Sequence, residues 1–274
     1  MQRDPPSDQP DLFSGGGFAA KPEAPPGAPE PAVAWHALGD LELIAALPKA
    51  DMAGSCAIAA EMARRRLAAA IPALEHACLR FSGYGRNHVL PEQAAALDAL
   101  AAIGGPEAAA AVARLILRRS VQGPGLKHAV RAAASLGSEL PPERLLDLLR
   151  HDEPEVRAGA CRCIGPRWKP EMVQVALDLL QDLHSEVRDA AACALGRMGQ
   201  PEAREFLLGL LGRAPSAEVI DALAAVADEE SMIRLNRLAR GDAAFRPAVL
   251  EALDAIEHPR ARSLAAALRG QPAG

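Results

Sequence analysis

A spacing of 31 residues recurs through the C-terminal half of this chain and restricts the folds that it can adopt. Several unrelated residue pairs share the spacing, so it does not depend on one accidental match. A period of this length is typical of short structural units that stack on one another. The pairs are Leu148-Leu149, Leu179-Leu180 and Leu210-Leu211; Ile164-Gly165, Leu195-Gly196 and Val226-Ala227; Pro170-Glu171 and Pro201-Glu202; and Glu155-Val156 and Glu186-Val187.

Each period predicts two helices. In the clearest unit the first helix starts at Pro170, since proline lacks the N–H that a first helical residue would leave unpaired. The second helix follows a turn at 182–184, and we expect Ser185 to cap it. One such pair cannot enclose a core, so the pattern predicts stacked pairs, an all-α solenoid. The apolar residues of the second helix recur at the spacing of one helical face, at Val187, Ala191, Ala194, Leu195 and Met198.

The repeat becomes less regular outside this region, but helix pairs are still expected over residues 35–270. Residues 35–66 form a first pair, and later first helices lie near 72–82 and 106–120. Ile103-Gly104 and Leu136-Gly137 mark the ends of second helices. Downstream, 231–240 pairs with 243–257, and 259–269 is a final helix. The total is about seven pairs, the last incomplete. Hydrophobic residues make up 50% of the chain and aromatic residues only 3%, which favours helices packed on helices over a β-sandwich.

Residues 1–34 have a different composition and form a separate segment. They contain eight prolines and the run Gly15-Gly16-Gly17, with few large apolar side chains. Such a segment buries too little surface to offset the entropy lost on ordering. A disordered N-terminal tail is therefore predicted.

The second helix of the clearest unit resembles bacterial HEAT repeats, including the phycobilisome-lyase-like subgroup. The similarity is carried by Ser185-Glu186-Val187-Arg188-Asp189-Ala190-Ala191-Ala192-Cys193-Ala194-Leu195-Gly196 followed by Pro201-Glu202-Ala203, and by a degraded copy that starts at Glu155-Val156-Arg157. It extends over residues 141–212. The resemblance implies an α-solenoid whose second helices line a concave face, and it implies a role in partner binding without identifying the partner.

Two arginines, Arg157 and Arg188, occupy equivalent positions of adjacent repeats. One hypothesis is that they form a basic ladder that binds carboxylates or phosphates of a partner. The other, which the resemblance favours, is an internal ladder in which each arginine binds an Asp or a helix-end carbonyl group of the neighbouring repeat. The family places an Asp a few residues before Val-Arg. Asp182 fits this pattern, whereas His151 stands at the equivalent position one repeat earlier, so the ladder is expected to be irregular there.

Trp168 lies in the turn between two helix pairs. Beside cationic neighbours it would make an interface anchor, or it packs over the end of its own helix pair.

Enzymatic and metal-binding motifs are not found in the sequence. Cys161 and Cys163, two residues apart on a helix, point about 200° apart and cannot chelate one ion. No His is followed by Glu, and there is no nucleophile elbow, Gly-rich phosphate loop or His-Glu-x-x-His. We therefore expect no catalytic residues, no cofactor and no metal site.

The charge balance bears on partners and location. The net charge is −5, which argues against nonspecific binding to nucleic acid. The runs Arg64-Arg65-Arg66 and Arg118-Arg119 are interpreted as charges that complement helix ends. No signal peptide or membrane span is apparent, and the five cysteines fit a reducing compartment. A cytoplasmic monomer that does not bind membranes is expected.

One short motif in the tail suggests a specific partner. Gln9-Pro10-Asp11-Leu12-Phe13 resembles the motif Gln-x-[Ser/Asp]-Leu-Phe with which bacterial proteins bind the sliding clamp. The resemblance implies that Leu12 and Phe13 fill an apolar pocket of the clamp while Gln9 and Asp11 complete the motif. Three hypotheses result: a non-catalytic scaffold that binds a protein, a replication or repair accessory that binds the clamp, and a lyase- or chaperone-like HEAT factor.

Overall fold

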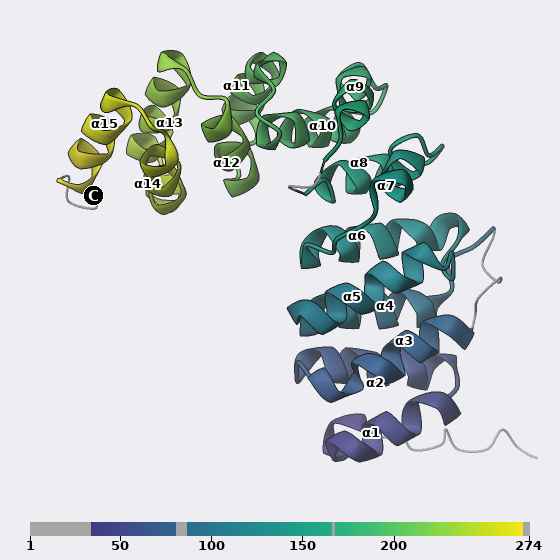
Figure 1. Cartoon of the computed structure of the whole chain (residues 1–274). Helices are drawn as coiled ribbons and strands as arrows, with labels where there is room; N and C mark the ends of the chain where they lie inside the picture. Colours follow the sequence, from purple (N-terminus) through teal and green to yellow (C-terminus); the bar gives the residue numbers. More distant parts are fainter. Residues whose placement is uncertain (1–33, 81–86, 166–167, 271–274) are drawn as a thin grey trace, which may run out of the picture. The chain divides into compact units, whose positions relative to one another are not determined.

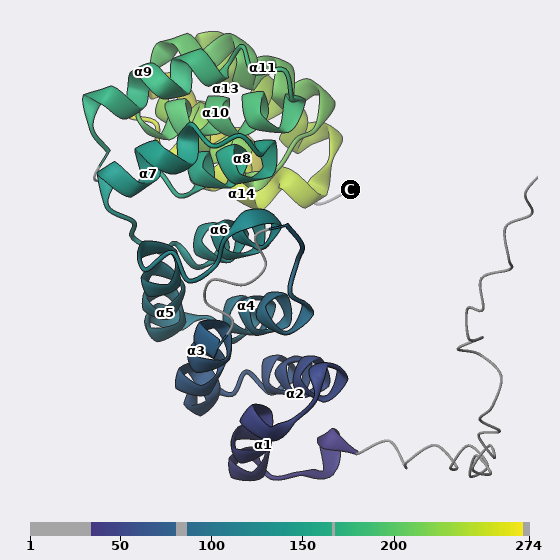
Figure 2. The same cartoon turned by 90° about the vertical axis from the view of Figure 1, so that its right-hand side faces the viewer.

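The computed structural model describes residues 34–80, 87–165 and 168–270, and within them it contains helices and no strands. Figures 1 and 2 show α-helices connected by short turns. The predicted all-α solenoid is confirmed. The predicted disordered tail, with the Gln9, Asp11, Leu12 and Phe13 motif, lies outside the described residues apart from Ala34.

The helices follow one another as pairs, each with a first and a second helix, and a single helix closes the series. The pairs are α1 (Asp40–Ala46) with α2 (Met52–Arg64), α3 (Ile71–Arg80) with α4 (Pro91–Ile103), α5 (Gly105–Leu117) with α6 (Leu126–Leu136), α7 (Pro142–Leu149) with α8 (Pro154–Arg162), α9 (Pro170–Leu179) with α10 (Ser185–Arg197), α11 (Arg204–Arg213) with α12 (Ala217–Ala225), and α13 (Glu229–Gly241) with α14 (Arg246–Ala255); α15 (Pro259–Arg269) is last.

The second helices form one continuous row. Each of α2, α4, α6, α8, α10 and α12 packs on the second helix of the next pair, ending at α14. Alanine is the most frequent buried residue type in these helices taken together, and small side chains let helix axes approach closely. All five apolar residues predicted on one face of α10 are buried. The row of second helices therefore carries the core from repeat to repeat.

The start of α10 differs from the prediction. Ser185 does not cap this helix; it is the first helical residue, and His184 is the N-cap, without a side-chain cap bond. The Asp182 carboxylate accepts a hydrogen bond from the His184 backbone N–H at 2.9 Å. This bond orders the turn before Ser185 is reached, but it does not replace the cap, because it uses the N–H of the N-cap residue and not one of the first helical turn.

Glycines at the ends of second helices have two different roles. Gly104 and Gly137 have φ values of +77° and +61°, in the left-handed region where glycine ends a helix without strain. Gly196 instead lies inside α10. A Cβ atom at this position would be 2.6 Å from the Ala222 carbonyl oxygen and 2.8 Å from Leu207 Cδ1. Gly196 is therefore required for the contact between α10 and its neighbours.

None of the helices in the described part of the chain is both long and apolar enough to span a bilayer.

We predict that Gly196→Ala destabilises the protein, because the new methyl group would displace the α12 backbone. The expected loss is about 1–3 kcal/mol in the free energy of unfolding. Gly209→Ala is a matched control, since Gly209 also lies inside a helix but the nearest atom to its added Cβ is Arg213 Nη1 at 3.7 Å. The control should gain up to ~1 kcal/mol from helix propensity. Urea unfolding of both variants checks this; equal effects would contradict the packing role of Gly196.

Candidate partner-binding site

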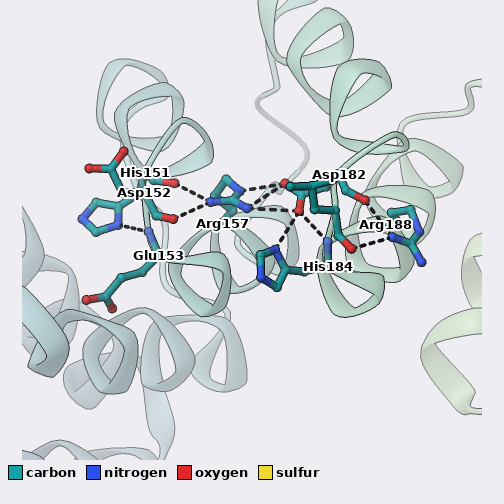
Figure 3. A network of polar contacts seen from close by, with 8 residues as sticks. His151, Asp152, Glu153, Arg157, Asp182, His184 and Arg188 are labelled. Atoms are coloured by element: carbon teal, nitrogen blue, oxygen red, sulfur yellow. Dashed lines mark hydrogen bonds and ion pairs between the residues drawn. The ribbon is translucent and has the colours of Figure 1, made fainter.

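Arg157 and Asp182 join two successive repeats near their helix–helix turns (Figure 3). Arg157 Nη1 donates to the carbonyl oxygens of His151 and Asp152, both at 2.8 Å, in the turn of its own repeat. Its Nε and Nη2 donate to the two carboxylate oxygens of Asp182, at 2.9 and 3.0 Å, in the turn of the next repeat. The predicted internal ladder therefore describes Arg157. We refer to Arg157, Asp182 and Arg188 as the arginine ladder.

Asp182 is almost fully buried, with 8% of its side chain exposed. Burial by itself raises the pKa of this carboxyl group. The hydrogen bonds from the His184 backbone, Arg157 and the His184 ring outweigh burial, so the pKa of Asp182 lies below its ordinary value. Asp182 is therefore ionised at neutral pH and holds the Arg157 guanidinium in a fixed orientation.

His151 accounts for the predicted irregularity of the ladder. It stands 31 residues before Asp182, and its Nδ1 accepts a hydrogen bond from the Glu153 backbone N–H at 3.1 Å. Asp182 makes the same bond to His184, also two residues ahead. The imidazole thus reproduces the turn but supplies no carboxylate for an arginine of the preceding repeat.

Arg188 makes only one of the two sets of bonds that Arg157 makes. Its Nη1 donates to the carbonyl oxygens of Asp182 at 2.7 Å and Leu183 at 3.1 Å, as Arg157 does in its own turn. It has no carboxylate partner among the described residues, because Ala214 takes the position before the N-cap of α12 that Asp182 takes before the N-cap of α10. Arg213 forms an ion pair with Asp189. The expectation that Arg157 and Arg188 contact a partner stays a prediction.

Trp168 is half-buried and packs against the core. It also lines a pocket of about 620 Å³, so it is accessible to a ligand. Lys169 beside it forms an ion pair with Glu143, with 2.8 Å between Nζ and Oε1. We name this cavity the Trp168 pocket; its other large apolar residues are Leu117, Leu140, Leu145, Ile164 and Met172.

A second cavity, the charged groove, lies over the second helices α6, α8, α10 and α12. Its charges alternate in sign and are paired between helices, so they do not form a continuous basic stripe. The pairs are Lys127–Glu155 at 3.8 Å, Arg162–Glu186 at 3.4 Å and Arg197–Glu218 at 3.0 Å. Arg131 is the remaining charged residue of the lining, and it pairs with Asp98 at 2.7 Å. Arg162 lines both this groove and the Trp168 pocket, which makes the two cavities neighbours.

The remaining candidate residues, the two cysteines and Arg65, lie in the core or bind groups of their own helix pair. Cys161 and Cys163 are buried, and burial raises the pKa of each thiol to about 12, so neither is a thiolate at neutral pH. In the described ranges no group of three or more His, Cys, Asp or Glu side chains is placed to hold a metal ion. Arg65 binds Glu61, Asp40 and two carbonyl groups near α1, so it fastens the first helix pair.

The sequence did not indicate which atoms of the site meet. Asp182 was matched to Arg188 by its position before Val-Arg, yet its carboxylate binds Arg157 and only its carbonyl group binds Arg188. The 31-residue period could have indicated the Arg157–Asp182 pairing, because it places the turn with Asp182 in the repeat that directly follows Arg157. No comparable sequence signal indicated Arg162 and Arg197. They line one groove because of the way in which the faces of α8, α10 and α12 meet.

We predict that Asp182→Ala lowers the free energy of unfolding at pH 7 by about 2–3 kcal/mol, because it leaves the Arg157 guanidinium half-buried and unpaired. Asp98→Ala is the matched control. It removes an equally short Arg–Asp pair between repeats, but one whose side chains are 65% and 56% exposed, so a loss of at most ~1 kcal/mol is expected.

The Asp182 contribution should depend on pH. The folded-state pKa is lowered, so the contribution is complete above the unfolded-state pKa and is lost as the pH falls through the folded-state pKa. Urea unfolding between neutral and strongly acidic pH should show wild type and Asp182→Ala converging in acid. A difference that persists unchanged would contradict this assignment.

Comparison with known protein families gives a match to part of the chain. Residues 142–227 match the model of a family described as HEAT repeats, over the repeats that contain the arginine ladder and most of both cavities. No curated protein matches this chain. The match supports a HEAT-repeat protein.

Proposed function

We propose that this protein is a non-catalytic scaffold that binds a protein partner through the Trp168 pocket and the adjoining charged groove. The proposal rests chiefly on one observation: an apolar pocket with an accessible tryptophan continues, through Arg162, into a groove of paired charges. HEAT repeats generally mediate protein–protein interactions, and stacked repeats provide extended surfaces for them.

The Trp168 pocket has the properties of an anchor site. Tryptophan is among the residues that contribute most to binding energy at protein interfaces, especially where surrounding contacts exclude water. Trp168 is held by the core on one side, so binding would cost little further ordering. Leu117 on the pocket wall is 45% exposed and offers apolar surface that a partner side chain could cover.

The charged groove is better matched to a polypeptide than to nucleic acid. A phosphate backbone requires cations that are free to replace its counterions. In the groove each of Arg162 and Arg197 already lies against a carboxylate. A polypeptide with both polar and charged side chains can exchange hydrogen bonds with such pairs at the rim of an interface.

The proposed location, oligomeric state and family subgroup rest on the sequence alone. We propose a cytoplasmic monomer that resembles the phycobilisome-lyase-like HEAT proteins of bacteria. A lyase- or chaperone-like factor is the alternative within that resemblance. It would use the same surface to hold a client protein.

We predict that Trp168→Ala weakens binding of the partner by about thirtyfold, the effect of losing ~2 kcal/mol at an interface anchor. The partner would first be captured from source cells with the full chain, identified by mass spectrometry and purified. Calorimetry with the purified partner then gives the dissociation constants.

Trp35→Ala is the matched control, because Trp35 is also a half-buried tryptophan packed against the core but lies beside α1. It should bind like wild type. Unchanged affinity in Trp168→Ala, with the variant folded by circular dichroism, would contradict the proposed site.

The tail motif supports a second candidate function, a replication or repair accessory that binds the bacterial sliding clamp. Its support is the sequence Gln9-Pro10-Asp11-Leu12-Phe13, which lies outside the described residues. The two functions are compatible, since the tail would tether the protein while the solenoid binds a different partner.

We predict that a purified bacterial sliding clamp binds the full chain and does not bind the double variant Leu12→Ala, Phe13→Ala, because both apolar side chains would be needed to fill the clamp pocket. Surface plasmon resonance on immobilised clamp checks this. Trp168→Ala is the control and should bind the clamp normally. Absence of binding by wild type, or equal binding by the double variant, rejects the clamp.

A further inference from the structure

We infer that Arg188 and its surroundings form a receptor site for a carboxylate on an acidic segment of a protein partner. The inference rests on the proposed function, because it names the chemistry of a second contact on the same scaffold. Its evidence is a comparison of Arg157 and Arg188, which occupy equivalent positions of adjacent repeats. Both bind two carbonyl groups of their own turn, but only Arg157 also binds a carboxylate.

Arg157 defines what this position binds when it is fully paired. Its Nη1 is fixed by two carbonyl groups of its own turn, and the edge formed by Nε and Nη2 receives both oxygens of one carboxylate. This bidentate geometry is the preferred mode of arginine with carboxylates. The chain therefore contains an occupied example of the site.

Arg188 has the same fixed guanidinium without the carboxylate. Nη1 is bound to the carbonyl groups of Asp182 and Leu183, so the orientation of the side chain is set in advance. Figure 3 shows its second terminal nitrogen turned away from the network. The Nε and Nη2 groups have no acceptor among the described residues. A ligand carboxylate would meet an arginine that needs little reordering.

The next repeat places no anion where the preceding example has one. Asp182 lies two residues before the N-cap of α10, and the position two residues before the N-cap of α12 is Ala214. Arg213, the last residue of α11, pairs instead with Asp189, which follows Arg188 on α10. Arg188 therefore has no carboxylate at the position that serves Arg157, and its positive charge is complementary to an acidic ligand.

The surroundings of Arg188 favour a polypeptide as the source of that carboxylate. Leu183, whose carbonyl group binds Arg188, is 94% exposed, the most exposed large apolar side chain in the described part of the chain. An exposed leucine beside an ordered arginine offers both apolar and ionic contact to one short segment. His184, in the same turn, is 54% exposed, and its Nδ1 lies 3.3 Å from Asp182 Oδ1, so the ring adds polar surface beside the leucine. We therefore expect an Asp or Glu close to an apolar residue in the ligand.

The test uses the full chain and three sets of short synthetic peptides that are identical except at one central position next to a leucine. That position is Asp, Asn or phosphoserine. Fluorescence anisotropy measures binding of each set to wild type, Arg188→Gln and Ala214→Asp. Ala214→Asp keeps Arg188 and places a carboxylate at the position that Asp182 takes one repeat earlier, so it should fill the site from within.

Wild type should prefer the Asp peptides over the Asn peptides by about tenfold. Both variants should lose the preference, and Ala214→Asp should also raise the urea midpoint through its new pair with Arg188. Equal binding of Asp and Asn peptides by wild type, or a preference that both variants retain, overturns the inference. Binding of phosphoserine peptides alone overturns it too, in favour of a phosphorylated ligand.

These results are separable from the proposed function. The partner affinity lost in Trp168→Ala does not depend on Arg188, so a failed carboxylate site leaves that test intact. If Trp168→Ala keeps full affinity while the Asp preference stands, the scaffold binds through the ladder and the Trp168 pocket is rejected.

Discussion

The close contact between successive second helices is the constraint on which the other features of this protein depend. A repeat of two short helices has no core of its own, so its stability comes from the faces that it buries against its neighbours. Gly159 and Gly196 show how tight these contacts are. An added Cβ would lie 2.6 Å from Val130 Cγ1 at the first position and 2.6 Å from the Ala222 carbonyl oxygen at the second. Such contacts set the distance between repeats.

That distance brings polar groups of successive repeats within hydrogen-bond range. Arg157 on α8 reaches Asp182 before α10 because the two turns are held side by side. The same stacking aligns Arg162 and Arg197 with carboxylates of neighbouring helices. The candidate surfaces are therefore products of repeat packing, and a substitution that loosens the row of second helices is expected to disturb them together.

Regular stacking also makes departures from the pattern informative. Asp182 completes one rung of the ladder, whereas His151 reproduces only the turn and Ala214 supplies no side-chain acceptor. In a repeat array each position has an internal reference, namely its equivalent one period away. Arg188 stands out for this reason: the bonds of Arg157 show what it lacks. A similar comparison could identify ligand sites in other irregular arrays.

The sequence alone determined the architecture, because the 31-residue period and the apolar faces depend only on the order of residues along each helix. It predicted the helix pairs and the burial of the α10 face, from Val187 to Met198, but it placed the cap at Ser185. Tertiary structure decided which atoms meet. Whether Arg157 binds Asp182, whether Trp168 lines a pocket, and whether Arg188 keeps a free edge depend on the rotation of helices from different repeats. One residue turns a helix by about 100°, and a hydrogen bond tolerates only a few tenths of an ångström. Periodicity does not specify positions that finely.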